Sequence, residues 1–133
     1  MPYTSALFYF GILTLVMLFV EIMFTYATQG FGYGFSSNRD PETKFSKLGL
    51  RIKRAYQNQI ESSAYIVPVL VAASFLRLEN SSAEIAALIL ILGRVVFAVL
   101  YYSGIPFARV LGFGMGTFST LFIGYMLLTS GLI

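Results

Sequence analysis

The chain opens with MPYTSALFYFGILTLVMLFV (residues 1–20), a stretch without a charged side chain. The hydrocarbon core of a bilayer is about 30 Å thick, and a helix needs about 20 apolar residues to cross it. The apolar run continues past Glu21 to about Thr28, which predicts a membrane-spanning helix. The run is continuous and does not alternate with polar residues, which argues against the strands of a membrane barrel.

Three more segments of this kind follow along the chain. Glu61 is the only charged residue between Arg54 and Arg77, Arg94 is the only one deep within the third segment, and the fourth has none after Arg109. We therefore expect an all-α, integral membrane four-helix bundle with up-and-down connections. The expected domain covers residues 1–133, with spans at 4–28, 50–76, 83–103 and 109–132.

The composition favours the same class of protein. Hydrophobic residues make up 57% and charged residues 11% of the chain, whereas charged residues make up about 25% of a typical soluble domain. A soluble domain of this size is too small to bury so much apolar surface. The basic residues behind the net charge of +3 are too localised to indicate binding of nucleic acid.

The chain contains neither cysteine nor histidine. It therefore has no disulfide framework and no thiolate nucleophile, and we expect no metal site. Chemistry on this chain has to use arginine, tyrosine, hydroxyl, amide or carboxylate groups, or a reactive group that a cofactor brings.

The distribution of basic residues predicts the orientation in the membrane. The third connection contains Arg109 and the second only Arg77. Because cytoplasmic loops carry an excess of Lys and Arg, we expect the first and third connections in the cytoplasm and both termini outside. Six of the nine basic residues lie in or beside the first connection, residues 29–49: Arg39, Lys44, Lys47, Arg51, Lys53 and Arg54.

One polar stripe runs along the cytoplasmic half of the second span. At about 100° per residue, its five polar side chains fall within about 80° of one another. Such a stripe is too costly to face lipid, so it must face another helix, another subunit or a wet pocket. Its members are Arg51, Arg54, Asn58, Glu61 and Tyr65.

Other polar residues gather at the same end of the bundle. Arg94 and Tyr101 share one face of the third span, Arg109 opens the fourth, and Glu21 lies near the cytoplasmic end of the first. At 1.5 Å per residue, Arg94 and Glu61 lie at similar depths, roughly 12–18 Å from the cytoplasmic boundary.

Two interpretations of these residues stay open. In the first they are clamps between helices, with Arg94–Glu61 and Arg54–Glu21 as neutralising pairs. In the second they form a binding site. We favour the site because the cations outnumber the anions, and surplus arginine suggests an anionic ligand bound through carboxylate or phosphate contacts.

Shorter motifs predict local structure. Asp40-Pro41 predicts the N-cap and first residue of a short interfacial helix. Ser81 and Glu84 form a capping box that opens the third span. In the fourth span, small residues recur at steps of four and would allow another helix to approach closely: Gly112, Gly116, Thr120 and Gly124.

The polar stripe also carries a resemblance to a known family. RAYQNQIE (residues 54–61) resembles the Arg-Ala-x-x-Asn-x-x-Glu signature on the second helix of the MAPEG family, the membrane-associated proteins in eicosanoid and glutathione metabolism. GRVVF (93–97) and YYSGIPFAR (101–109) resemble its third helix and the turn into the fourth. The resemblance covers the whole chain, and the short chain with SNRD (37–40) in its first connection is similar to the bacterial branch.

The resemblance implies a homotrimer in a bacterial inner membrane, in contact with lipid, with glutathione bound in the cytoplasmic half between neighbouring subunits. It implies that Arg109 faces the thiol and acts as the catalytic residue. With the polar stripe included, the expected glutathione-binding residues are Arg51, Arg54, Asn58, Glu61, Tyr65, Arg94 and Tyr101.

Three positions depart from the family pattern. Val110 stands where several members have a hydroxyl donor, Phe113 where some have tyrosine, and Phe97 where a polar residue occurs. Two functions therefore stay open. One is a glutathione-dependent transferase or peroxidase that acts on lipophilic electrophiles or lipid hydroperoxides. The other is a non-enzymatic membrane scaffold or accessory subunit that retains the fold.

The expected orientation predicts the accessibility of a single introduced cysteine. Asn38→Cys, in a chain without other cysteines, should not react with a membrane-impermeant maleimide on intact cells and should react after the cells are opened. Ser81→Cys, in the second connection, is the matched control and should react on intact cells. Labelling of position 38 from outside would show that the orientation is reversed.

Overall fold

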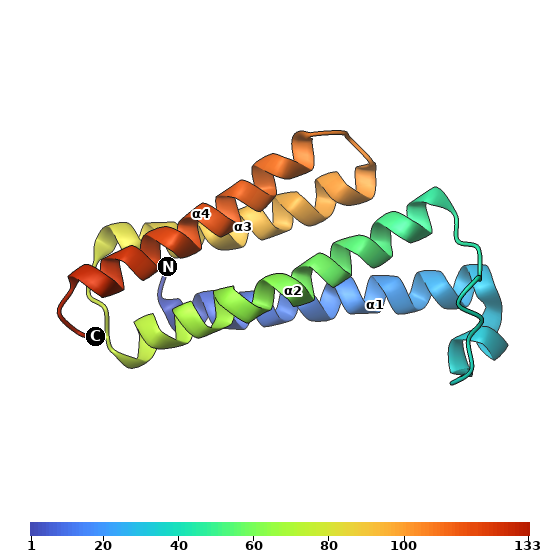
Figure 1. The fold of residues 1–133 in the computed structure, drawn as a ribbon, viewed down its shortest axis with the longest axis horizontal. Coiled ribbons are helices and arrows are strands. Elements are labelled where there is room, and N and C mark those ends of the chain that lie inside the picture. Colours follow the sequence, from blue (N-terminus) through green and yellow to red (C-terminus); the bar gives the residue numbers. More distant parts are fainter.

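The structure is a computed structural model that describes the backbone of residues 1–133 and every side chain except that of Ala108. Over these residues the chain forms four helices and no strand, which confirms the all-α fold. Figure 1 shows both termini and the α2–α3 turn at one end of the molecule, and the α1–α2 and α3–α4 connections at the other. The helices are α1 (Tyr3–Phe35), α2 (Lys47–Phe75), α3 (Ser81–Ser103) and α4 (Ala108–Thr129).

Three of these helices, α1, α3 and α4, are long and apolar enough to cross a membrane. The remaining helix, α2, carries the polar stripe and runs antiparallel to α1 (Figure 1). At 1.5 Å per residue, the 33 residues of α1 and the 29 of α2 make helices of about 50 and 43 Å, longer than the hydrocarbon core. Both helices are therefore longer than a crossing of the hydrocarbon core requires.

The connection between α1 and α2 differs from its prediction. Helix α1 continues through its glycines to Phe35, with a kink at Gly30, where φ is 83° and glycine is the residue that adopts this angle readily. The connection is therefore shorter than residues 29–49. The expected short helix after Asp40 does not form, because the Asp40 side chain accepts a hydrogen bond from the Glu42 N–H at 2.9 Å and holds a turn.

The start of α3 also differs from its prediction. The N-cap is Asn80, whose side-chain oxygen accepts from the Ala83 N–H at 2.9 Å. Ser81 is the first helical residue, so the proposed Ser81–Glu84 capping box is wrong. Asparagine and serine are similarly good N-caps, and adjacent candidates are not separated by sequence preference alone.

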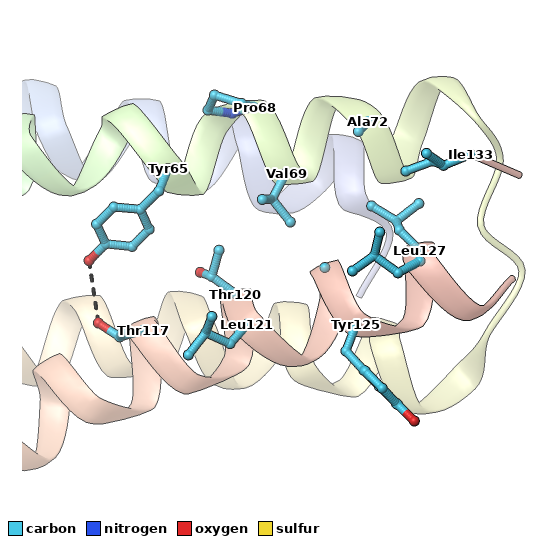
Figure 2. A pocket seen from close by; sticks show the side chains of 12 residues that line it. Tyr65, Pro68, Val69, Ala72, Thr117, Thr120, Leu121, Tyr125, Leu127 and Ile133 are labelled. Atoms are coloured by element: carbon cyan, nitrogen blue, oxygen red, sulfur yellow. Dashed lines mark hydrogen bonds between the residues drawn. The ribbon is translucent and has the colours of Figure 1, made fainter.

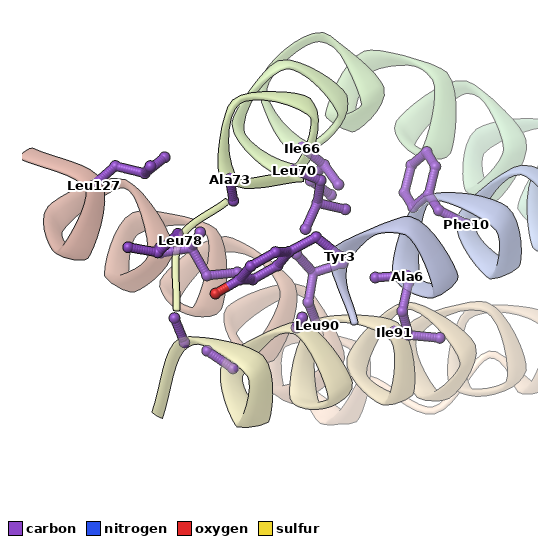
Figure 3. Packing of buried hydrophobic residues seen from close by; sticks show 14 residues of the cluster. Tyr3, Ala6, Phe10, Ile66, Leu70, Ala73, Leu78, Leu90, Ile91 and Leu127 are labelled. Carbon is purple, nitrogen blue, oxygen red and sulfur yellow. The ribbon is translucent and has the colours of Figure 1, made fainter. Parts of the chain in front are cut away.

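The main apolar core fills the half of the bundle nearest the termini. Figure 3 shows Tyr3 and Phe10 of α1 packed with Ile66 and Leu70 of α2 and Leu90 of α3. Near the other end the buried apolar cluster is much smaller, with Met17, Ala55 and Ala98 as its buried members. The bundle thus has an apolar half near the termini. In its other half, near the α1–α2 and α3–α4 connections, polar side chains fill the interior, and we call this the polar half.

Helix α4 packs closely on α3 because two of its glycines leave room. A Cβ atom on Gly112 would lie 2.5 Å from the backbone nitrogen of Phe97, and one on Gly116 would lie 3.0 Å from Cδ of Arg94. Part of the small-residue stripe therefore packs as expected. Gly124 behaves differently, since a Cβ atom there would meet no atom within 4 Å in the described part of the chain.

This packing predicts the effect of adding one methyl group to α4. Gly112→Ala should destabilise the protein by about 1–3 kcal/mol, because overpacking forces backbone shifts. Gly114→Ala is the matched control, since its Cβ atom would lie an ordinary 3.7 Å from the Phe118 ring and alanine is the better helix former. Thermal unfolding followed by circular dichroism in detergent measures both. A Gly112→Ala protein that melts at or above the wild-type temperature would contradict the packing.

Candidate functional site

Arg94 lies at the centre of the polar half, with none of its surface exposed (0%). Its Nε donates to Oε1 of Gln59 at 2.9 Å, and its Nη2 donates to Oδ1 of Asn58 at 3.0 Å. Its guanidinium carbon lies 4.4 Å from the centroid of the Phe97 ring. Within the described residues Nη1 has no partner. The buried guanidinium group of Arg94 is therefore bound by two amide oxygens, and no carboxylate of the described residues pairs with it.

Gln59 connects three helices and was not predicted as part of the site. It is fully buried (0%), and its Nε2 donates to Oγ1 of Thr14 on α1 at 3.0 Å. Thr14 in turn donates to the backbone oxygen of Phe10 at 2.8 Å. Gln59 lies about 100° around the helix from Asn58 and thus outside the polar stripe. The signal in the sequence that indicates this role is a lone polar residue on the face of α2 that turns toward the bundle interior.

A second series of hydrogen bonds runs from Asn58 to α4. Ser62 Oγ donates to Asn58 Oδ1 at 3.4 Å, and Tyr65 OH donates to Ser62 Oγ at 3.3 Å. The Tyr65 hydroxyl also lies 3.3 Å from Oγ1 of Thr117 (Figure 2). Residues three and four apart share one face of a helix, so α2 holds these groups in one row that ends at α4.

Aromatic rings link Arg94 to the start of α4. Phe97 and Tyr101 lie one turn apart on α3, with ring centroids 5.3 Å apart. The guanidinium carbon of Arg109 lies 4.6 Å from the centroid of the Tyr101 ring, and the Arg109 side chain is exposed. Two arginines and two rings thus form one continuous series of cation–π and edge-to-face contacts from the interior to the first turn of α4.

Arg51 contacts the C-terminal end of α3. Its Nε donates to the backbone oxygen of Tyr102 at 3.2 Å. That helix ends at Gly104, whose φ of 72° places it in the left-handed region, and a Cβ atom there would lie 3.0 Å from the Arg51 guanidinium carbon. Arg51 therefore satisfies one of the terminal carbonyl groups of α3, as basic side chains commonly do at helix C-termini.

Neither ion pair of the clamp interpretation forms among the described side chains. Glu21 pairs with Nζ of Lys53 at 3.2 Å and not with Arg54. Glu61 accepts from Nε2 of Gln57 at 3.2 Å, while Arg94 bonds to the two amides. The exposed side chains of Arg54 and Glu61 instead point away from the protomer interior on the outer face of α2.

A groove of about 750 Å³ lies between α2 and α4 in the apolar half. Pro68, Val69 and Leu121 line it, and Tyr65 and Thr117 stand at the end nearest the polar half (Figure 2). The protomer therefore places an apolar groove next to a row of hydrogen-bonding groups. Such an arrangement suits a ligand with a polar part and an oily part, or two ligands of those kinds.

The site residues that the sequence predicted divide into three sets. Asn58, Tyr65 and Arg94 share one hydrogen-bond network, which Tyr101 and Arg109 join through cation–π and edge-to-face ring contacts. Arg51 binds the C-terminal end of α3. Arg54 and Glu61 lie on the outer face of α2. The structure adds residues that were not expected at the site: Thr14, Gln59, Ser62 and Thr117.

Comparison with known proteins gives one match. The model of the MAPEG family matches residues 6–129, a range that contains every residue of the network described above. No curated protein and no solved structure is significantly similar to the chain.

Proposed function

The chain belongs to the MAPEG family, and from this premise we propose that it is a membrane-bound, glutathione-dependent transferase or peroxidase. Its second substrate would be a lipophilic electrophile or a lipid hydroperoxide. The observation that carries the proposal is the polar half of the bundle, where Arg94 and its amide partners lie behind an outer row of polar side chains on α2. A chain without cysteine needs a thiol from outside, and glutathione brings one.

The outer row on α2 suits a peptide with charges of both signs. Arg54, Asn58 and Glu61 are spaced four and three residues apart, which places their side chains next to one another on one helix face. Glutathione carries two carboxylates and one ammonium group. Arginine binds carboxylates through paired hydrogen bonds, and a glutamate is a partner for an ammonium group.

The exposure of this row supports assembly of several protomers. Arg54 and Glu61 are exposed on the protomer, although α2 runs beside a helix that is apolar enough to cross the membrane. Ionisable side chains in that position are costly in contact with lipid. We therefore propose that neighbouring subunits cover the row and that glutathione binds between them. We take the number of subunits, three, from what membership of the family implies.

Arg109 is the proposed group that stabilises the thiolate. A free thiol titrates near pH 8.5, and both a nearby cation and a helix N-terminus favour its thiolate form. Arg109 lies exposed in the first turn of α4, with its guanidinium group against the Tyr101 ring. In conjugation, the thiolate sulfur would form a bond to an electrophilic carbon, and the leaving group would depart with the electron pair of its own bond.

The apolar groove offers space for the lipophilic substrate. It lies between two helices, is open at the surface, and ends at the Tyr65 hydroxyl, which belongs to the polar network. An oily substrate that enters from the bilayer would therefore reach the polar half without crossing water.

The alternative function is a membrane scaffold or accessory subunit without catalysis. Val110, beside Arg109, is exposed and offers no hydroxyl to a thiolate. Phe113 likewise carries no hydroxyl, and Phe97 is buried with its ring against Arg94. These three positions favour a protein that keeps the fold and a thiol ligand but does not activate the thiol.

Glutathione binding is the first prediction of the proposal. At a hundredfold excess over its dissociation constant, glutathione should stabilise the wild type by about 2.7 kcal/mol. Arg54→Ala and Glu61→Gln should each remove most of this stabilisation, because each removes one charge of the outer row. Arg77→Ala and Glu79→Gln, at the opposite end of the bundle, are the matched controls and should keep it. A thermal-shift titration measures all five proteins, and unchanged shifts in both outer-row variants would place the ligand elsewhere.

Thiolate formation is the second prediction, and it separates the enzyme from the scaffold. Arg109→Ala should abolish the ultraviolet thiolate absorbance of bound glutathione and the conjugation of an aryl halide at pH 7. Val110→Ser should restore a donor beside Arg109 and raise the conjugation rate about tenfold where chemistry limits it, since a charge-assisted hydrogen bond contributes about 1.5–3 kcal/mol. Val110→Ala, small but without a hydroxyl, is the matched control. Bound glutathione without conjugation in any of these proteins would favour the scaffold.

A further inference from the structure

Asn58 is held in one orientation by its neighbours. Its Oδ1 accepts from Arg94 Nη2 at 3.0 Å and from Ser62 Oγ at 3.4 Å. A guanidinium group only donates hydrogen bonds, so the opposite orientation of the amide would place donor against donor. A carbonyl oxygen has two lone pairs, and both are used here. Asn58 can therefore bind a further group only through the N–H bonds of Nδ2.

The Nδ2 group of Asn58 is available for that role. Asn58 is half-buried, and no hydrogen bond from Nδ2 forms within the described part of the chain. The amide thus offers two N–H donors at the edge of the outer row on α2. Because Arg94 draws on the carbonyl oxygen of the same amide, its charge strengthens these donors.

Arg94 itself cannot reach a ligand directly. It is fully buried, Gln59 holds its Nε, and Gly116 and the Phe97 ring enclose its side chain. Its influence on a bound molecule has to pass through Asn58. The direction of Arg94 is in turn set by Gln59, because Gln59 Nε2 is tied to Thr14 on α1 and its Oε1 is thereby turned toward Nε of Arg94.

We propose that Gln59, anchored by Thr14, is a positioning residue that directs Arg94 onto the carbonyl oxygen of Asn58 and so fixes Asn58 as a donor to the ligand. The group bound at Asn58 is then a hydrogen-bond acceptor, a carboxylate or a peptide carbonyl. The inference rests on the proposed function for the identity of the ligand, glutathione. The orientation of the Asn58 amide, in contrast, is a property of the ligand-free protein.

The first experiment measures that orientation without ligand. The chain has asparagines at three positions, Asn38, Asn58 and Asn80, so selective ¹⁵N-asparagine labelling gives a simple set of side-chain amide signals. In Gln59→Leu and in the milder Thr14→Val, the Asn58 signal should shift or broaden while the other two stay in place. An unchanged Asn58 signal in a folded Gln59→Leu protein, or in Thr14→Val where Gln59→Leu does not fold, would overturn the proposal.

The second experiment measures the dissociation constant of glutathione by calorimetry. Gln59→Leu should weaken binding about fivefold, the value of one ordinary hydrogen bond. The same substitution in an Asn58→Ala background should change binding less than twofold, because its effect passes through Asn58. Thr129→Val, at the opposite end of the bundle, removes a hydroxyl whose hydrogen bonds go to the backbone oxygens of Tyr125 and Met126, and it should leave the dissociation constant unchanged.

The outcomes of the two experiments separate the inference from the proposed function. Equal weakening by Gln59→Leu in both backgrounds would show a general loss of structure and overturn the positioning role. A wild type that does not bind glutathione, together with a shifted Asn58 signal in Gln59→Leu, would overturn the proposed function and support the role of Gln59 in orienting Asn58.

Discussion

Arg94 places a guanidinium group inside a helical bundle in which three helices, its own helix α3 included, are apolar enough to cross a membrane. A charge at the centre of a membrane helix costs about 2.5–3.5 kcal/mol even on the most lenient scale, and it requires partners that replace water. Two consecutive amides of α2, Asn58 and Gln59, supply the acceptors. Helix α4 supplies the space, because a side chain on Gly116 would crowd the Arg94 stem. This one group therefore fixes how α2, α3 and α4 sit together.

The need to satisfy Arg94 accounts for the division of the bundle into two halves. Near the termini, apolar side chains of α1, α2 and α3 fill the interior and need no hydrogen-bond partners (Figure 3). In the polar half, a continuous series of hydrogen bonds ends at the surface of α2. It joins Thr14, Gln59, Arg94 and Asn58. Apart from Nη1 of Arg94, the polar groups of this series are paired, and paired buried polar groups make a rigid support for the side chains in front of them. The outer row of α2 is thus mounted on a fixed framework, as a binding site requires.

Much of the fold could be predicted from the sequence, because the helices follow from long uncharged runs and charge marks where they end. The partners of the charged groups could not be predicted. Depth along a helix follows from residue number, and the Arg94 side chain does reach the level of Asn58 and Gln59, within one helical turn of Glu61. The rotation of α2 about its axis depends on packing, and it turns Gln59 inward and Glu61 outward. The pairing of Glu21 with Lys53 in place of Arg54 follows from that same rotation. The sequence does show that the polar stripe of α2 is too costly to face lipid, but it leaves another helix, another subunit and a wet pocket as equal candidates for what covers the stripe.

The central claim is that the outer row of α2 is completed by neighbouring subunits with glutathione between them. Native mass spectrometry of the purified protein in a mild detergent, recorded with and without glutathione, tests this claim most directly. We expect a trimer that gains up to three glutathione molecules, and we expect no glutathione on any monomer released from it. A monomer as the sole species, or a monomer that binds glutathione as well as the assembly does, would contradict the claim.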